Sequence, residues 1–171
     1  MWRACSPTTS SRRFRYHVAA GVAASAEGVR GARVHIEVET RNVDGRVTSL
    51  GTAEQFTLVV DRPAEGWGGG LGFSGGQLLY LAVAGCISND LFREARTVGI
   101  GLESVRVKVA GNLAGESMVS DEILYEVELK GDAPEDRLQA LVDQVDEIAE
   151  IPNSLRQGTQ VRLAGSSVTG N

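Results

Sequence analysis

The chain has 171 residues, 42% of them hydrophobic, and a net charge of −5. This length and composition suit a single domain with a buried core, and no apolar run is long enough to span a membrane. An acidic protein repels the phosphate backbone, so nucleic-acid binding is disfavoured. Two cysteines and two histidines are too few for a disulfide scaffold or a transition-metal site, and we expect neither a metal nor a cofactor. The sequence predicts a soluble, cytoplasmic protein.

Residues 1–31 differ in composition from the rest of the chain. They hold five arginines and a single acid, show no convincing strand pattern and lack the continuous apolar core of a secretory signal. The excess of arginine is typical of transit peptides, but we interpret the segment as a disordered extension or the product of an early start codon. The folded domain is expected to span residues 32–171, and Cys5 is given no role.

The first part of the domain is predicted to form two strands. Residues 32–40 alternate between apolar and polar side chains, which indicates a strand with one buried face. A turn is expected at residues 42–45, which end in Asp-Gly, and residues 54–61 alternate again. Pro63 and a glycine-rich run over residues 66–76 then break the pattern.

The glycine-rich run contains Gly70-Leu71-Gly72-Phe73-Ser74-Gly75, a literal match to G-x-G-x-x-G. The context does not fit dinucleotide binding, because the preceding strand ends about nine residues too early and no acid ends the next strand. We interpret Ser74 and Gln77 instead as a capping box that starts a helix. The glycines are expected to make the approach to this helix flexible, or to let the backbone pass close to a partner subunit or a ligand.

A long helix is predicted from Gly75 to about Thr97. It is apolar nearly all round between Leu78 and Ile87, so it should be buried on most sides. After the helix, alternating side chains predict strands around residues 105–109 and 123–129, each with one solvated face.

A second, amphipathic helix is expected to begin near residues 132–135, where Asp132 can cap it and Glu135 can reach back. A short helical turn over residues 152–156 and a last strand around residues 161–163 complete the prediction. The predicted order is β-β-α-β-β-α-β. This is an α+β architecture in which antiparallel sheets pack on a long central helix and a second amphipathic helix.

Cys86 lies in the middle of the long helix and is the single cysteine of the predicted domain. Asn89, Asp90 and Arg93 follow at helical spacing and should lie on the same side. They form either a satisfied polar cluster beside an inert thiol or part of a reactive site. Burial and the Asp90 carboxylate would both raise the thiol pKa, so activation requires another cation. The candidates, from this subunit or a partner, are Arg41, Arg46, Arg62 and Arg156.

The segment from Gly75-Gly76-Gln77-Leu78-Leu79 to Ala84-Gly85-Cys86, with the later Gly99-Ile100 and valine strand, resembles the OsmC/Ohr family of osmotically induced and organic-hydroperoxide-resistance proteins. The resemblance extends over about residues 32–165. It implies an α+β homodimer with the cysteine helix at its centre. In the active members, a first cysteine attacks the peroxide and a second cysteine before a proline resolves it as a disulfide, while an arginine and a glutamate poise the thiolate.

The functional residues of the family carry over only in part. Cys86 matches the attacking cysteine. The resolving cysteine would fall at Ile151, directly before Pro152, and the glutamate would fall at Gly76, so both are absent. The resemblance therefore implies a divergent branch in which oxidised Cys86 needs an external thiol or a partner protein to restore it.

The arginine of the family would fall near Val43, with Arg41 and Arg46 two and three residues away. A first hypothesis is thus a one-cysteine peroxidase or peroxide sensor in oxidative-stress defence. In this hypothesis Cys86 attacks an organic hydroperoxide, and Arg41 or Arg46 activates the Cys86 thiol. In this hypothesis the substrate-binding residues are Asn89, Asp90 and Arg93.

Two further hypotheses compete with a peroxidase. The chain is either a non-catalytic homodimer that binds a small hydrophobic molecule at an interface pocket, or an enzyme of different chemistry. The residues available for that chemistry are Asn89, Asp90, Arg93 and Arg156.

Overall fold

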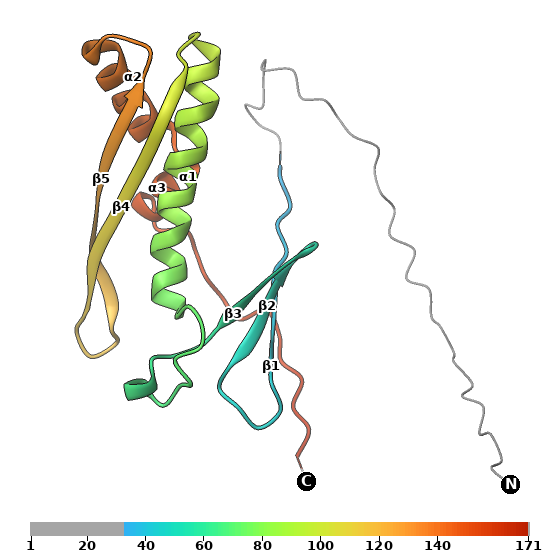
Figure 1. The fold of residues 1–171 in the computed structure, drawn as a ribbon. Coiled ribbons are helices and arrows are strands. Elements are labelled where there is room, and N and C mark those ends of the chain that lie inside the picture. Colours follow the sequence, from blue (N-terminus) through green and yellow to red (C-terminus); the bar gives the residue numbers. More distant parts are fainter. Residues whose placement is uncertain (1–32, 171) are drawn as a thin grey trace, which may run out of the picture. The chain divides into compact units, whose positions relative to one another are not determined.

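The computed structural model describes residues 33–170. The extension predicted for residues 1–31, with Cys5, lies outside these residues. In chain order the elements are β1 (Glu39–Asn42), β2 (Ser49–Ala53), β3 (Phe56–Val60), the short 3-10 helix η1 (Ala64–Gly66), α1 (Gly75–Thr97), β4 (Leu102–Ala114), β5 (Val119–Gly131), α2 (Glu135–Ile148) and α3 (Glu150–Arg156). The predicted α+β class is confirmed, with two antiparallel sheets and three α-helices (Figure 1). Every helix within residues 33–170 is too short or too polar to cross a lipid bilayer.

The first sheet has three strands in the order β1-β2-β3, where the sequence pattern predicted two. Strand β2 is missed because its sequence, Ser-Leu-Gly-Thr-Ala, is mostly small and polar and lacks an apolar alternation. It joins β3 through a tight turn in which Ala53 pairs with Phe56 and Glu54 adopts a left-handed conformation with φ of 51°.

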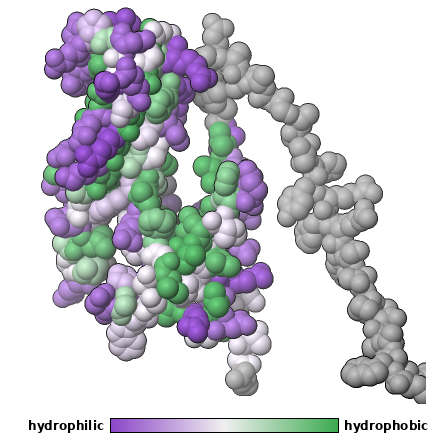
Figure 2. Space-filling view, viewed as in Figure 1, coloured by the Kyte–Doolittle hydropathy of each residue, from purple (hydrophilic) through white to green (hydrophobic). Residues whose placement is uncertain are grey.

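The prediction of a strand over residues 32–40 is wrong for most of its length, because β1 begins only at Glu39. Val34, Ile36 and Val38, which were expected to be buried, are 76%, 78% and 69% exposed. A strand needs a neighbouring backbone to bond its amides and carbonyls, and β2 ends one residue beyond the partner of Glu39. Figure 2 shows apolar surface gathered over this sheet.

The glycine-rich segment after β3 folds around the buried carboxylate of Asp61, which is 3% exposed. The hydroxyl of Thr48 donates to it at 3.1 Å, and the backbone amides of Arg62, Gly69 and Leu71 donate at 2.7, 3.1 and 3.2 Å. Burial by itself raises the pKa of Asp61, but these hydrogen bonds outweigh it and hold the pKa below its usual value.

Two glycines of this segment are required by close backbone approach. A Cβ at Gly68 would lie 1.9 Å from the carbonyl oxygen of Arg62, and one at Gly72 would lie 2.3 Å from that of Val59. Among the described residues, the close approach predicted for these glycines is therefore to the chain itself. The segment is an ordered wrap around Asp61 that ends at the start of α1.

Low pH is expected to reduce the stability that the buried Asp61 carboxylate gives to this segment. Because the folded-state pKa of Asp61 is depressed, its contribution to stability is present above the unfolded pKa of about 4 and is lost as the pH falls through the folded value. Thermal unfolding of Asp61→Asn should give a lower Tm than wild type at neutral pH, with the difference shrinking below about pH 4. A Tm difference that stays constant down to pH 2 would contradict this account.

The main core lies between α1, α2 and the inner face of the β4–β5 hairpin (Figure 1). Ile87 and Leu91 of α1 are 1% and 0% exposed and pack with Leu141 and Val145 of α2. Alternate residues of the hairpin face this cluster, which confirms the strands predicted there: Val105, Val107, Tyr125, Val127 and Leu129.

Helix α1 has the bounds and the capping box predicted for it. The side chain of Ser74 accepts from the Gln77 amide at 3.4 Å, and the Gln77 side chain accepts from the Ser74 amide at 2.8 Å. The helix is not buried on most sides, however, because Leu81 and Phe92 are 48% and 50% exposed. One of its faces is therefore uncovered in the single chain.

The prediction that Asp132 caps the start of α2 is wrong. The N-cap is Pro134, with no side-chain hydrogen bond, because the carboxylate of Asp132 instead accepts the backbone amide of Gly101 at 2.7 Å. The short helix predicted near Pro152 is confirmed as α3. The last strand predicted around residues 161–163 is absent from the described part of the chain, where Val161 and Leu163 are 95% and 85% exposed.

Candidate functional site

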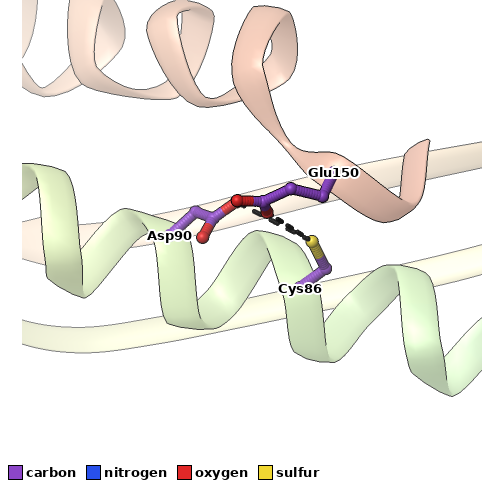
Figure 3. Close-up of side chains that lie close together, drawn as sticks. All are labelled: Cys86, Asp90 and Glu150. Atoms are coloured by element: carbon purple, nitrogen blue, oxygen red, sulfur yellow. Dashed lines mark hydrogen bonds between the residues drawn. The ribbon is translucent and has the colours of Figure 1, made fainter. Parts of the chain in front are cut away.

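Cys86 sits midway along α1, where the helix passes the start of α3 (Figure 3). The core residues Ile87 and Leu91 fix the rotation of α1, and the thiol then faces the turn between α2 and α3. Its sulfur lies 3.7 Å from a carboxylate oxygen of Asp90 and 3.6 Å from one of Glu150. The backbone amide of Ile151 donates to the same sulfur at 3.5 Å.

The surroundings of Cys86 favour the protonated thiol. Burial raises the thiol pKa, and the negative charges of Asp90 and Glu150 raise it further. The hydrogen bond from the Ile151 amide acts in the opposite direction, since it stabilises the thiolate, but it does not reverse the shift. The site therefore holds a neutral thiol beside two carboxyl groups.

Arg93 ties the carboxyl groups of this cluster together. Its guanidinium contacts Asp90 at 2.6 Å, Glu94 at 2.9 Å and Glu150 at 3.6 Å. Burial raises the pKa of Asp90 despite the opposing effect of this guanidinium. A hydrogen bond from its own backbone amide lowers the pKa of Glu150, so Asp90 binds a proton more readily than Glu150 does.

Cys86, Asp90 and Glu150 also have the donor chemistry of a metal site, with ligand atoms within 4.8 Å of one another. However, the positive charge of Arg93 already lies against both carboxylates and opposes a second cation between them. The arrangement fits an ion-paired cluster better than a metal centre.

The structure brings together three of the residues singled out in the sequence: Cys86, Asp90 and Arg93. Asn89 is exposed and makes none of the cluster's hydrogen bonds. Asn89 lies on the uncovered face of α1 rather than over the thiol.

The structure does not bring any of the four candidate arginines to Cys86 within the described part of one chain. Arg41 lies on β1 and pairs with Glu39 at 3.5 Å, while Arg46 lies in the turn after that strand. Arg62 contributes its backbone amide to Asp61. The guanidinium of Arg156 donates to the backbone carbonyl of Asp146 at 2.7 Å and also contacts the Asp146 carboxylate. The hydroxyl of Tyr125 donates to the same carboxylate.

Two residues of the site, Glu150 and Ile151, have no signal in the sequence taken alone. They are separated from Cys86 by more than 60 residues, and only the docking of α3 beside α1 makes them neighbours. The available clue was the resemblance, which placed the missing resolving cysteine at Ile151.

A cavity of about 370 Å³ lies between α1, β5 and α3, and Cys86, Asp90, Arg93 and Glu150 are not among the described residues that line it. Leu79 and Val83, on the turns of α1 before Cys86, form one wall, while Pro152 and Leu155 of α3 form another. The remainder of the lining comes from Arg156 of α3 and from five residues of β5: Ser120, Asp121, Glu122, Ile123 and Tyr125. Such a volume suits a small organic molecule. The α1 wall is apolar, while Asp121, Glu122 and Arg156 add charged groups to the other walls.

Comparison with known proteins identifies the family of this fold. The family model described as OsmC-like protein matches residues 68–164, which is more than half of the chain. The comparison with curated proteins gives no match.

Several solved structures share the fold at low sequence identity. An OsmC-like protein from Mycoplasma pneumoniae has a TM-score of 0.64 at 19% identity, covering 75% of this chain and 91% of that one. An organic hydroperoxide resistance protein OsmC from Legionella pneumophila has a TM-score of 0.52 at 20% identity, covering 73% and 91%. The organic hydroperoxide resistance protein OhrB of Bacillus subtilis has a TM-score of 0.52 at 17% identity, covering 73% and 93%.

Proposed function

Because the chain belongs to the OsmC-like protein family, we propose that it reduces organic hydroperoxides with Cys86 as its one attacking thiol. The observation that carries this proposal is the position of Ile151. The backbone of the residue that stands in place of a resolving cysteine lies 3.5 Å from the Cys86 sulfur. The spatial relation needed for a two-cysteine site is thus kept, while the second sulfur is missing.

The proposed reaction is simple to balance. The Cys86 sulfur attacks one peroxide oxygen, the S–O bond forms and the O–O bond breaks, and the products are a cysteine sulfenic acid and an alcohol. The sulfur is oxidised by two electrons and the peroxide is reduced. Two equivalents of an external low-molecular-weight thiol then restore the cysteine and form a disulfide and water.

The apolar α1 wall of the cavity supports an organic rather than an inorganic peroxide. Leu79, Val83 and Leu155 would contact the apolar group of the substrate, and the peroxide oxygens would point toward Cys86. We place this activity in oxidative-stress defence in the cytoplasm. The family resemblance supports this role.

The proposal is tested by turnover. Purified protein, an excess of small thiol and tert-butyl hydroperoxide should consume the hydroperoxide catalytically, and Cys86→Ser should reduce consumption to the background rate. A Cys5→Ser variant is the matched control and should retain the full rate. Equal consumption by wild type and Cys86→Ser would exclude Cys86 as the nucleophile.

A second candidate function is the binding of a small hydrophobic molecule without catalysis. It is favoured by the raised pKa of the Cys86 thiol and by the apolar walls of the cavity. In this case a ligand should co-purify and be displaced by a long-chain fatty acid, and Cys86→Ser should bind it unchanged.

We propose further that the protein is a homodimer in which two copies of α1 meet. The uncovered face of α1, which we define as Leu81, Ala82, Gly85, Asn89 and Phe92, is exposed along its whole length in the single chain. Large apolar residues elsewhere are also uncovered, including Val34, Ile36 and Val38 before β1. Exposed apolar surface of this extent is typical of an interaction surface, and the family resemblance points to a second copy. Sedimentation equilibrium measures the state directly.

A further inference from the structure

The carboxyl groups of Asp90 and Glu150 meet beside the Cys86 thiol (Figure 3). One oxygen of each group and the sulfur lie within 4.8 Å of one another. Burial raises the pKa of Asp90, and a hydrogen bond from its own backbone amide lowers that of Glu150. Two carboxyl groups this close repel each other when both are ionised, which favours retention of one proton by the pair. The pair is therefore suited to exchange a proton with the sulfur, which lies 3.7 Å from Asp90 and 3.6 Å from Glu150.

The charges around the pair also favour retention of a proton. Helix α1 supplies Asp90, Arg93 and Glu94, and α3 supplies Glu150. Three carboxyl groups thus surround a single guanidinium, and a bound proton relieves the excess of negative charge. Asp90 is 3% exposed, while the Glu150 side chain is 66% exposed and sits at the solvent side of the pair.

Attack by a neutral thiol on a hydroperoxide poses a proton-transfer problem. The sulfur must lose its proton to become a nucleophile, and the departing alkoxide oxygen must gain one. The Glu150 carboxyl oxygen lies 3.6 Å from the Cys86 sulfur, close enough to serve both needs as the substrate approaches. The position at which the resemblance expects a glutamate, Gly76, offers no carboxyl group.

We propose that the Asp90–Glu150 carboxyl pair moves the thiol proton of Cys86 to the leaving oxygen of the hydroperoxide, with Glu150 as the exchanging group. This inference rests on the proposed hydroperoxide reductase activity. Glu150 accepts the proton from sulfur as the S–O bond forms, and the pair delivers a proton to the alkoxide as the O–O bond breaks. The pair regains its original protonation, so the step conserves protons.

Two reactions of the Cys86 thiol distinguish proton transfer by Glu150 from mere repulsion between the Glu150 charge and the thiolate. Alkylation by iodoacetamide requires the thiolate but no proton for its iodide leaving group, whereas reduction of tert-butyl hydroperoxide requires both. Glu150→Gln removes a negative charge next to the sulfur, so it should accelerate alkylation at neutral pH. The same variant should slow hydroperoxide reduction by about tenfold or more, because the exchanging carboxyl is lost.

The experiment compares both rates as a function of pH in a Cys5→Ser background. Glu147→Gln is the matched control, because it removes an equal charge at an exposed position at the end of α2 and should leave both rates unchanged. Glu150→Asp keeps a carboxyl group and should recover part of the hydroperoxide rate, which a purely structural role would not predict.

The outcomes are distinct. Opposite changes of the two rates in Glu150→Gln support the relay. Rates that rise together, or remain equal to those of Glu147→Gln, overturn the relay while leaving the reductase function intact. A wild-type protein that is alkylated but never oxidised by the hydroperoxide overturns the proposed function, and the relay falls with it.

Discussion

Replacing Ile151 with cysteine is expected to convert the one-cysteine site into a two-cysteine site. The backbone amide of Ile151 lies 3.5 Å from the Cys86 sulfur, so a thiol attached to this residue would lie within bonding reach. After attack on the hydroperoxide, the sulfenic acid should condense with the new thiol to a disulfide, with loss of water. Cys86 oxidised in this way is no longer dependent on direct attack by an external thiol.

Mass spectrometry distinguishes the two products after one equivalent of hydroperoxide. Wild type should gain one oxygen, whereas Ile151→Cys should lose two hydrogens and be restored by a dithiol. The resolving step should be faster by about 100-fold or more than with a free thiol at millimolar concentration, because the second sulfur is held in place. Ile148→Cys, at the more exposed end of α2, is the matched control and should form no such disulfide. A stable extra oxygen in Ile151→Cys would show that position 151 does not occupy the resolving site.

The second large effect, a loss of dimer affinity, is expected from a substitution at Gly85 on the uncovered face of α1. A Cβ at this position meets nothing within 4 Å in the single chain, and leucine is a stronger helix former than glycine. Gly85→Leu should therefore leave the monomer at least as stable. If two copies of α1 meet there, the added side chains overfill the interface, at a cost of about 1–3 kcal/mol per site, and the dimer Kd should rise by about tenfold or more.

Sedimentation equilibrium over a concentration series measures this change. Ala140→Leu places the same side chain on the exposed surface of α2 and should not alter the dimer. An unchanged dimer in Gly85→Leu would mean that the copies associate through another surface, such as the apolar residues of the first sheet.

Local sequence signals are sufficient for the elements that carry their own pattern. The capping box of Ser74 and Gln77 gives the start of α1, and the alternating valines give the core of β4. Strand β2 has no such pattern, since its place depends on pairing with β1 and β3. Asp132 shows the same limit, because a distant amide, that of Gly101, competes for the side chain expected to cap α2.

In the candidate site, too, local spacing predicts some residues, whereas others depend on long-range packing. The spacing of Cys86, Asp90 and Arg93 on one helix was enough to predict that they lie together, because a single helix fixes their relative positions. Asn89 shares the spacing but lies on the uncovered face of α1. Glu150 reaches the thiol only through the packing of α3, which no local pattern encodes.

The central claim is that Cys86 is a working nucleophile despite the raised pKa of its thiol. The most direct test mixes pre-reduced Cys5→Ser protein with one equivalent of tert-butyl hydroperoxide and follows the intact mass over time. We expect a gain of one oxygen within minutes, localised to Cys86 by peptide mapping and absent from the Cys5→Ser/Cys86→Ser double variant. An unchanged mass over hours at neutral pH would contradict the claim and leave the cavity as a binding site for a hydrophobic ligand.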